Sequence, residues 1–168
     1  YPAGVRENGV QYTHGAVWLI RALFEEGRSE EAYALLQMIS PVTRCEQPAD
    51  AAVYKAEPYA MAADVYAAPD AKGRAGWTLY TGSAGWYYRT AVESFLGLRL
   101  EGDRLTLSPH LPASMPGYTA RIRRKGGEIR IRVERTKDAP GLTVDGEPAG
   151  FVPLDGRDHT ACLRLPPA

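Results

Sequence analysis

The chain has 168 residues, of which 45% are hydrophobic and 24% charged, a composition typical of a globular protein with a packed core. Its 20 basic and 20 acidic residues give a formal net charge of zero, so the overall charge does not favour nucleic acid or a membrane surface as a partner. The apolar runs are too short to span a bilayer. The two cysteines, Cys45 and Cys162, do not make a disulfide framework, the three histidines lack ligand spacing, and we expect two small buried thiols and no metal site.

The first half of the chain, from Gln11 to about Gly97, has the hydrophobic periodicity of helices. A first helix is expected to end at Gly27, and a second to be capped by Ser29 and to end before Pro41. In the first helix the apolar residues Trp18, Leu19, Ala22 and Leu23 recur at three- and four-residue spacing. The residues expected to face inward in the second are Ala32, Leu35, Leu36 and Ile39.

A less regular region follows the second helix. We expect a loop through Pro48, then an irregular stretch rich in aromatic residues over residues 54–66. A third helix is predicted over about residues 83–96. The residues expected to face inward in it are Trp86, Thr90, Val92 and Phe95.

After Gly97 the pattern changes to alternating apolar and polar residues. The segments LRLEGDRLTLSP (98–109), YTARIRRKGGEIRIRVERT (118–136), LTVDGEPAG (142–150) and HTACLRLPP (159–167) indicate strands. Gly-containing turns within the first three predict hairpins, and hence an antiparallel β-sandwich or part of one. The arginines at positions 121, 123, 130 and 132 alternate with apolar residues, which favours a solvated sheet face over a nucleic-acid patch.

These patterns predict an α+β fold with two domains, residues 1–97 and residues 98–168. Three helices cannot close around so much aromatic surface. We therefore expect residues 1–97 to be a slice of a larger helical structure, followed by its β domain.

Three clusters in the helical half contain residues that could carry chemistry: GVRENGVQYTHGA (4–16), YKAEPYAMAADVY (54–66) and TGSAGW (81–86). A helix N-terminus beside a histidine can hold an anion. Each cluster also has an ordinary structural interpretation. Asn, Thr and Gly are common capping residues, a histidine before a helix can be a hydrogen-bonded core residue, and the glycines of TGSAGW allow close helix packing.

Taken in order, RENGVQYTHGA, YKAEPYAMAADVY, GWTLYTGSAGWYYR and LGLRLEGDRLTLSPHLPASMPGY resemble the C-terminal third of the inverting cellobiose-phosphorylase family. The resemblance covers essentially the whole chain. It is strongest to the branch that acts on β-1,2-glucans, which includes 1,2-β-oligoglucan phosphorylases and the phosphorylase-like domain of cyclic β-1,2-glucan synthases. Relatives that act on cellobiose carry a glutamine after the EPY motif, whereas this chain has Ala62, Ala63 and Asp64, which argues against cellobiose as substrate.

The resemblance implies the C-terminal part of an (α/α) six-hairpin toroid barrel followed by a jelly-roll-like β-sandwich. It also implies phosphorolysis of a β-glucosidic bond with inversion, which gives α-glucose 1-phosphate. Inorganic phosphate is then a co-substrate and no cofactor is required. One carboxylic acid protonates the leaving oxygen, while phosphate takes the place of the attacking water of an inverting hydrolase.

By motif match, the resemblance implies phosphate contacts from His14, Thr81 and Gly82. Glu7 matches a glutamate that helps to bind the acceptor sugar. Tyr12 and Trp86 are candidates for sugar stacking or for walls of the pocket. The general-acid aspartate of the family has no matching motif here, and Asp64 is not assigned that role.

The resemblance further implies that the chain, which begins Tyr-Pro-Ala-Gly, is a piece of a longer protein and is inactive alone. Its expected partners are a β-glucan oligosaccharide, phosphate and the rest of the catalytic barrel, with self-association through uncovered apolar surface. Its expected location is the cytoplasm, or the cytoplasmic face of the inner membrane for a cyclic glucan synthase. Two alternatives remain: a carbohydrate-binding module, and a fragment of a glucoamylase-like hydrolase, which would need a second carboxylate as base.

Overall fold

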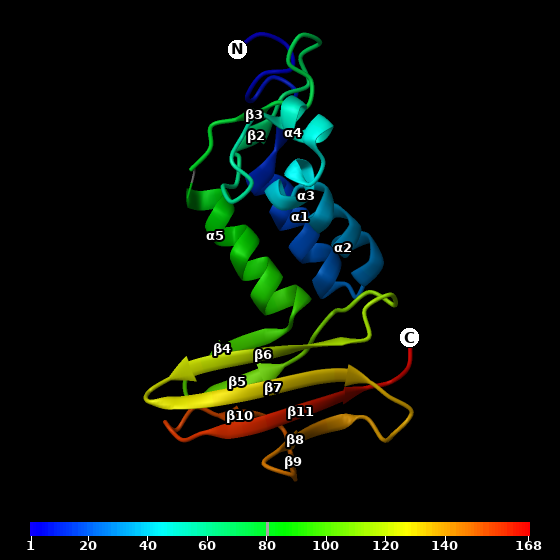
Figure 1. Cartoon of the computed structure of the whole chain (residues 1–168), viewed down its shortest axis with the longest axis vertical. Helices are drawn as coiled ribbons and strands as arrows, with labels where there is room; N and C mark the ends of the chain where they lie inside the picture. The colour runs from blue at the N-terminus through cyan, green and yellow to red at the C-terminus, as the bar shows by residue number, and fades with distance from the viewer. Residues whose placement is uncertain (80) are drawn as a thin grey trace. The chain divides into compact units, whose positions relative to one another are not determined.

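The computed structural model describes residues 1–79 and 81–168, so Tyr80, within the GWTLYTGSAGWYYR motif, lies outside the described residues. The chain forms two compact units, Tyr1–Ala91 and Val92–Ala168, hereafter the helical unit and the β unit (Figure 1). The protein is therefore a mixed α and β structure with several sheets, as predicted. That the first half of the chain is the C-terminal part of a toroid barrel, and that the second is a jelly-roll-like sandwich, stay predictions.

The helical unit is built around one central helix. Helix α1 (Thr13–Glu25) packs against both α2 (Ser29–Met38) and α5 (Thr81–Arg89), as Figure 1 shows. Two short helices follow α2, namely α3 (Pro41–Cys45) and α4 (Pro48–Tyr54). The expected loop through Pro48 is therefore wrong, because both prolines stand at helix starts, where the missing N–H leaves no hydrogen bond unmade.

The apolar residues at helical spacing in α1 do not all face the core. Leu23 is buried, but Trp18 and Leu19 are 55% and 56% exposed, and Ala22 is also exposed. The core side of the helix is formed instead by Val17, Ile20 and Phe24. Helix α1 is apolar on almost its whole circumference, so periodicity alone could not select the buried face. Its predicted end is confirmed, since Gly27 follows with φ +76°.

Helix α2 starts at Ser29, but Arg28 occupies the N-cap position, and the side chain at that position makes no capping hydrogen bond. Its fully buried residues are Ala32 and Leu36, and Leu35 and Ile39 are half-buried. The predicted third helix is present as α5, which continues into a π-helical segment, η1 (Thr90–Phe95). Of the residues expected to face inward there, Thr90 is fully buried, and Trp86, Val92 and Phe95 are half-buried.

A small antiparallel sheet of order β1-β2-β3 joins distant segments of the helical unit. Its strands are β1 (Gln11–Tyr12), β2 (Asp64–Val65) and β3 (Ala75–Gly76). Strand β2 lies at the end of the stretch over residues 54–66 that was predicted to be irregular, and residues 55–63 form neither helix nor strand.

The β unit contains two sheets. The three-stranded sheet has the order β10-β5-β4, from β4 (Leu98–Glu101), β5 (Arg104–Leu107) and β10 (Val152–Pro153). The five-stranded sheet has the order β6-β7-β11-β8-β9. Its strands are β6 (Gly117–Arg124), β7 (Gly127–Arg135), β8 (Gly141–Val144), β9 (Glu147–Ala149) and β11 (His159–Leu165).

The three predicted hairpins are present, but the expectation of purely antiparallel pairing is wrong. Strand β11 pairs in parallel with β7, with His159 opposite Ile129 and Leu165 opposite Arg135. A long excursion through β8, β9 and β10 separates these two strands in the chain, and parallel pairing requires such a crossover.

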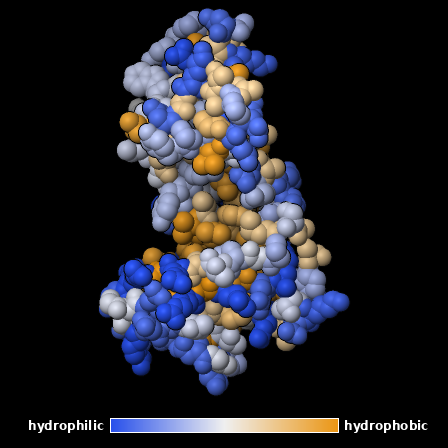
Figure 2. Space-filling view, viewed as in Figure 1, coloured by the Kyte–Doolittle hydropathy of each residue, from blue (hydrophilic) through white to orange (hydrophobic). Residues whose placement is uncertain are grey.

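Both sheets of the β unit contribute to one apolar core. Leu105 of β5, Val133 of β7 and Val152 of β10 are almost completely buried in it. The arginines at positions 121, 123, 130 and 132 are exposed, which confirms the predicted solvated face. On the side shown in Figure 2, hydrophilic residues predominate over the strands, whereas apolar residues lie among the polar ones on the helical unit.

Candidate functional site

The small sheet of the helical unit brings the three chemistry-bearing clusters together. Strand β1 belongs to the first cluster, β2 to the second, and β3 leads into α5, where the third begins. Tyr12 pairs with Asp64, and Asp64 pairs with Gly76. Residues far apart in the sequence are thereby held in one short antiparallel ladder.

His14 lies in the first turn of α1 and faces Gly82 in the first turn of α5. A Cβ atom added to Gly82 would lie 3.5 Å from Nδ1 of His14. Nε2 of His14 is buried and has no hydrogen-bond partner among the described residues. Buried polar atoms are usually paired, so the unpaired Nε2 leaves the imidazole with hydrogen-bonding capacity that a ligand oxygen could use. The Nδ1 and Cε1 edge of the same ring faces the N-terminus of α5, where free N–H groups can also bind an anion.

An aromatic cluster surrounds the His14 ring. Trp18 meets it edge-on with ring centroids 4.8 Å apart, and the rings of Trp86 and Tyr12 each lie 6.3 Å from it. The rings of Trp18 and Trp86 are 5.9 Å apart. Tyr12 and Trp18 are each 55% exposed, so this cluster forms an accessible apolar wall beside the imidazole.

Trp18 is a candidate site residue that the sequence analysis did not assign to the site. Its signal was its position four residues after His14, because residues at that spacing share one face of a helix. Two arginines were also overlooked: the guanidinium groups of Arg21 and Arg89 stack on Trp86, at 5.5 and 5.4 Å from its centroid. They fix the indole from α1 and from α5.

The remaining predicted residues lie at the surface. Thr81 is the first residue of α5 and is exposed, immediately before Gly82. Glu7 is exposed in a tight turn, and no hydrogen bond or ring contact among the described residues joins it to His14. The structure thus brings His14, Gly82, Trp86 and Tyr12 together, and the assigned roles of all six residues stay predictions.

Asp64 is not available to a substrate as a proton donor. Its side chain is 1% exposed, and its Oδ2 accepts a hydrogen bond from Nη1 of Arg6 at 3.2 Å. Burial raises the pKa of the Asp64 carboxyl, and the adjacent Arg6 guanidinium opposes that rise.

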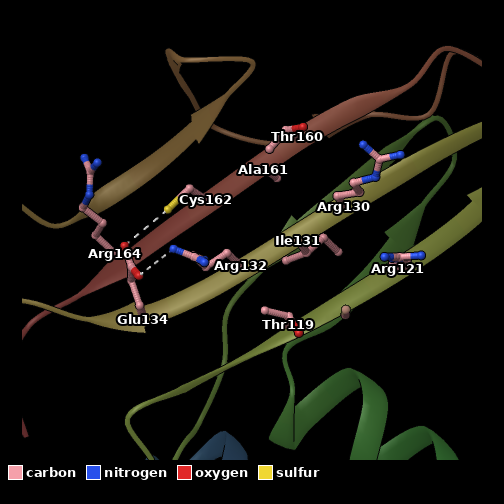
Figure 3. A pocket seen from close by; sticks show the side chains of 11 residues that line it. Thr119, Arg121, Arg130, Ile131, Arg132, Glu134, Thr160, Ala161, Cys162 and Arg164 are labelled. Atoms are coloured by element: carbon pink, nitrogen blue, oxygen red, sulfur yellow. Dashed lines mark hydrogen bonds and ion pairs between the residues drawn. The ribbon is translucent and has the colours of Figure 1, made fainter.

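A separate groove lies wholly within the β unit, on the outer face of its five-stranded sheet (Figure 3). Its volume is about 690 Å³, and its lining includes Arg121, Arg130, Arg132 and Arg164 but no aromatic side chain. Glu134 lies 3.7 Å from Arg132 and accepts from the thiol of Cys162 at 3.8 Å. A neutral sugar is usually held by stacking on aromatic rings, so this groove does not favour the carbohydrate-module alternative.

Three further features bear on function. Within residues 1–79 and 81–168, no cluster of three or more His, Cys, Asp or Glu side chains has the geometry to hold a metal ion. The helices formed by these residues are too short or too polar to cross a membrane. Cys45 and Cys162 are free thiols, half-buried rather than fully buried as expected. Cys45 packs at the margin of a small apolar cluster that includes Tyr54, and Cys162 lines the groove on the outer face of the five-stranded sheet.

Sequence comparison identifies the family. Residues 1–97 match the family model described as "Glycosyl hydrolase 94 superfamily, catalytic domain". The chain belongs to the glycosyl hydrolase 94 superfamily. Residues 98–160 match the model for "Glycosyl hydrolase family 65, C-terminal domain". The resemblance inferred from the four motifs is therefore confirmed.

The relatives found by sequence comparison are much longer than this chain. It is 50% identical over 135 residues to the cyclic beta-(1,2)-glucan synthase NdvB of Rhizobium meliloti, which covers 80% of this chain and 5% of that protein. It is 32% identical to solabiose phosphorylase and 28% identical to 3-O-beta-D-glucopyranosyl-beta-D-glucuronide phosphorylase, both of Paenibacillus borealis. These matches cover 94% and 97% of this chain, and 21% and 22% of the relatives.

Proposed function

We propose that this chain forms one wall of the active site of an inverting glycoside phosphorylase that cleaves β-glucosidic bonds with inorganic phosphate. The proposed linkage is β-1,2. The 50% identity to a cyclic beta-(1,2)-glucan synthase supports it, and so does the Ala62-Ala63-Asp64 sequence where relatives acting on cellobiose have a glutamine. The product would be α-glucose 1-phosphate.

One observation carries the proposal. The buried Nε2 of His14 has no partner among the described residues, and its ring faces Gly82 at the start of α5. We assign His14 as a donor to one phosphate oxygen, Gly82 as a backbone N–H donor, and Thr81 as a hydroxyl donor. Donors fixed in advance around an anion stabilise it without reorganisation as the reaction proceeds.

In this proposal the chain binds the phosphate, and the rest of the site supplies the acid catalyst. Phosphate is already a nucleophilic anion, so the reaction needs no carboxylate to activate it, in contrast to an inverting hydrolase. It does need a carboxylic acid to protonate the leaving oxygen. Asp64 is buried against Arg6 and does not serve, so we predict no release of glucose 1-phosphate by this chain alone.

The sugar would lie against the aromatic wall. Trp86 is fixed by Arg21 and Arg89, and Tyr12 and Trp18 are more than half exposed, so sugar rings can stack on them. Glu7 is assigned to the hydroxyl groups of the acceptor sugar.

The proposal is tested by phosphate binding to the full-length protein that contains this chain, measured by calorimetry. His14→Ala is expected to weaken binding at least about tenfold, since it removes a charge-assisted or neutral donor to the anion. His110→Ala, a change of the same residue type in the β unit, serves as the control and is expected to leave the affinity unchanged. Equal phosphate affinity in wild type and His14→Ala would show that the anion site is misassigned.

A further inference from the structure

The turn that presents Glu7 has an unusual backbone at the preceding residue. The N–H of Gly4 donates to the Asn8 carbonyl at 2.7 Å, and the N–H of Asn8 donates to the Val5 carbonyl at 3.2 Å. Arg6 and Glu7 therefore form the tip of the turn. Arg6 has φ +51°, a conformation that residues with a side chain seldom adopt, so other contacts must hold it there.

The Arg6 side chain supplies those contacts. It is 13% exposed, and its Nη1 donates to Oδ2 of Asp64 at 3.2 Å. The face of its guanidinium stacks over Trp77, 4.8 Å from the ring centroid. The side chain thereby bridges the first motif to the second and to the third, at a point adjacent to Glu7.

Asp64 is itself rigidly placed. It lies on β2, the middle strand of the small sheet, between Tyr12 of β1 and Gly76 of β3. A Cβ atom at position 76 would come within 2.3 Å of its Oδ1, so only glycine leaves room for the carboxylate. The anchor for Arg6 is therefore part of the sheet and not a mobile side chain.

A buried ion pair of this kind needs a reason other than stability. Removing two charges from water costs about as much as their attraction returns, and apolar pairs of similar volume are often equally stable. Oδ1 of Asp64 and Nε of Arg6 are also buried without hydrogen-bond partners among the described residues. The ion pair is costly in free energy, but it fixes the orientation of the Arg6 side chain, which apolar packing would not do.

We propose that Asp64 is a positioning residue: through its ion pair with Arg6 it fixes the turn that carries Glu7 and so orients the Glu7 carboxylate toward the acceptor sugar. This inference rests on the proposed function, because it assigns Glu7 to the acceptor. It gives Asp64 a role in the sugar half of the site and none in the phosphate half.

The test uses Asp64→Asn in the full-length protein, since Asn has the shape of Asp but cannot attract Arg6 as an anion. Steady-state kinetics are measured with β-1,2-linked glucose oligosaccharides as acceptors for glucose 1-phosphate, and with phosphate in the reverse direction. The KM for the acceptor is expected to rise about 10- to 100-fold, the cost of misplacing a binding group by about 1 Å. The KM for phosphate is expected to stay within about twofold. Asp70→Asn, the same change at an exposed position, is the control.

A double variant separates positioning from stability. Arg6→Met with Asp64→Leu replaces the ion pair by apolar side chains and is expected to recover the melting temperature but not the acceptor KM. Recovery of both, an unchanged acceptor KM in Asp64→Asn, or failure of both variants to fold would overturn the positioning role. Absence of any phosphorolysis by the wild type would instead refute the proposed function, and the positioning role would fall with it.

Discussion

Substitution of Gly82 by alanine separates the folding role of this glycine from its proposed binding role. Gly82 lacks a positive φ, and a Cβ atom there would be in ordinary contact with His14, 3.5 Å from Nδ1. The change should therefore stabilise α5 by about 0.5–1 kcal/mol, because alanine loses less backbone entropy than glycine. For a chain of this size the melting temperature should rise by about 1–4 °C.

The same methyl group would occupy the space beside the imidazole that the proposed phosphate needs. A tenfold loss of affinity corresponds to about 1.4 kcal/mol. At a phosphate concentration 100 times the wild-type Kd, phosphate should stabilise the wild type by about 2.7 kcal/mol, but Gly82→Ala by only about 1.4 kcal/mol. The phosphate-dependent rise in melting temperature should therefore fall by about half.

Gly85→Ala is the matched control for this experiment. Gly85 lies on the same helix, and no atom lies within 4 Å of a Cβ atom added there. Both variants should melt at a higher temperature than the wild type without phosphate, as differential scanning calorimetry can measure. Equal phosphate-induced shifts in the two variants would refute the placement of the anion at Gly82.

Two further predictions concern stability and association. The protonated ring of His159 donates from Nδ1 to Asp145 at 2.7 Å and from Nε2 to Asp155 at 3.0 Å, and the Asp145 contact is the main cause of the raised pKa of His159. Because its pKa is raised in the folded state, protonated His159 stabilises the fold fully below about pH 6.5, and this stabilisation is lost as pH rises through the folded-state pKa. The two aspartates have lowered pKa values, so their stabilisation is lost instead as pH falls below about 4. His159→Gln should therefore reduce the decline of melting temperature between pH 6 and 8, and an unchanged decline would contradict this assignment. Leu19 is 56% exposed on α1, so Leu19→Glu should lower the self-association of the 168-residue chain in sedimentation experiments, and equal association would show that another surface is responsible.

The elements that could be predicted from sequence are those fixed by local interactions. The hairpin at Asp145-Gly146 was predictable because both residues adopt positive φ, which Asp-Gly favours in a two-residue turn. The parallel pairing of β7 with β11 was not, because it depends on a partner strand far along the chain and has no local signal. Helices α3 and α4 were missed because each begins with a proline. In a sequence, a proline can indicate either the end of the preceding element or the first turn of a new helix.

In the candidate site, too, local motifs were predictable from sequence, whereas contacts that depend on tertiary packing were not. Motif matching assigned His14 and Gly82 to one phosphate through the resemblance, whereas local sequence patterns alone could not place them together, because their proximity depends on the packing of α1 against α5. Trp18 was not assigned to the site, because the sequence could not distinguish the buried face of α1 from an apolar face directed elsewhere. The Arg6–Asp64 ion pair was also unpredictable, because it spans 58 residues and depends on the register of β1 against β2.

The exposed apolar face of α1 also bears on the proposed function. A helix that is apolar on nearly its whole circumference is stable in water only where something covers most of it. Val17, Ile20 and Phe24 are covered within the helical unit, whereas Trp18 and Leu19 are more than half exposed. Trp18 also contacts His14, so the uncovered apolar stripe begins at the proposed anion site. A surface with this combination fits the active-site wall proposed above, whose enclosure sugar and other protein segments would complete.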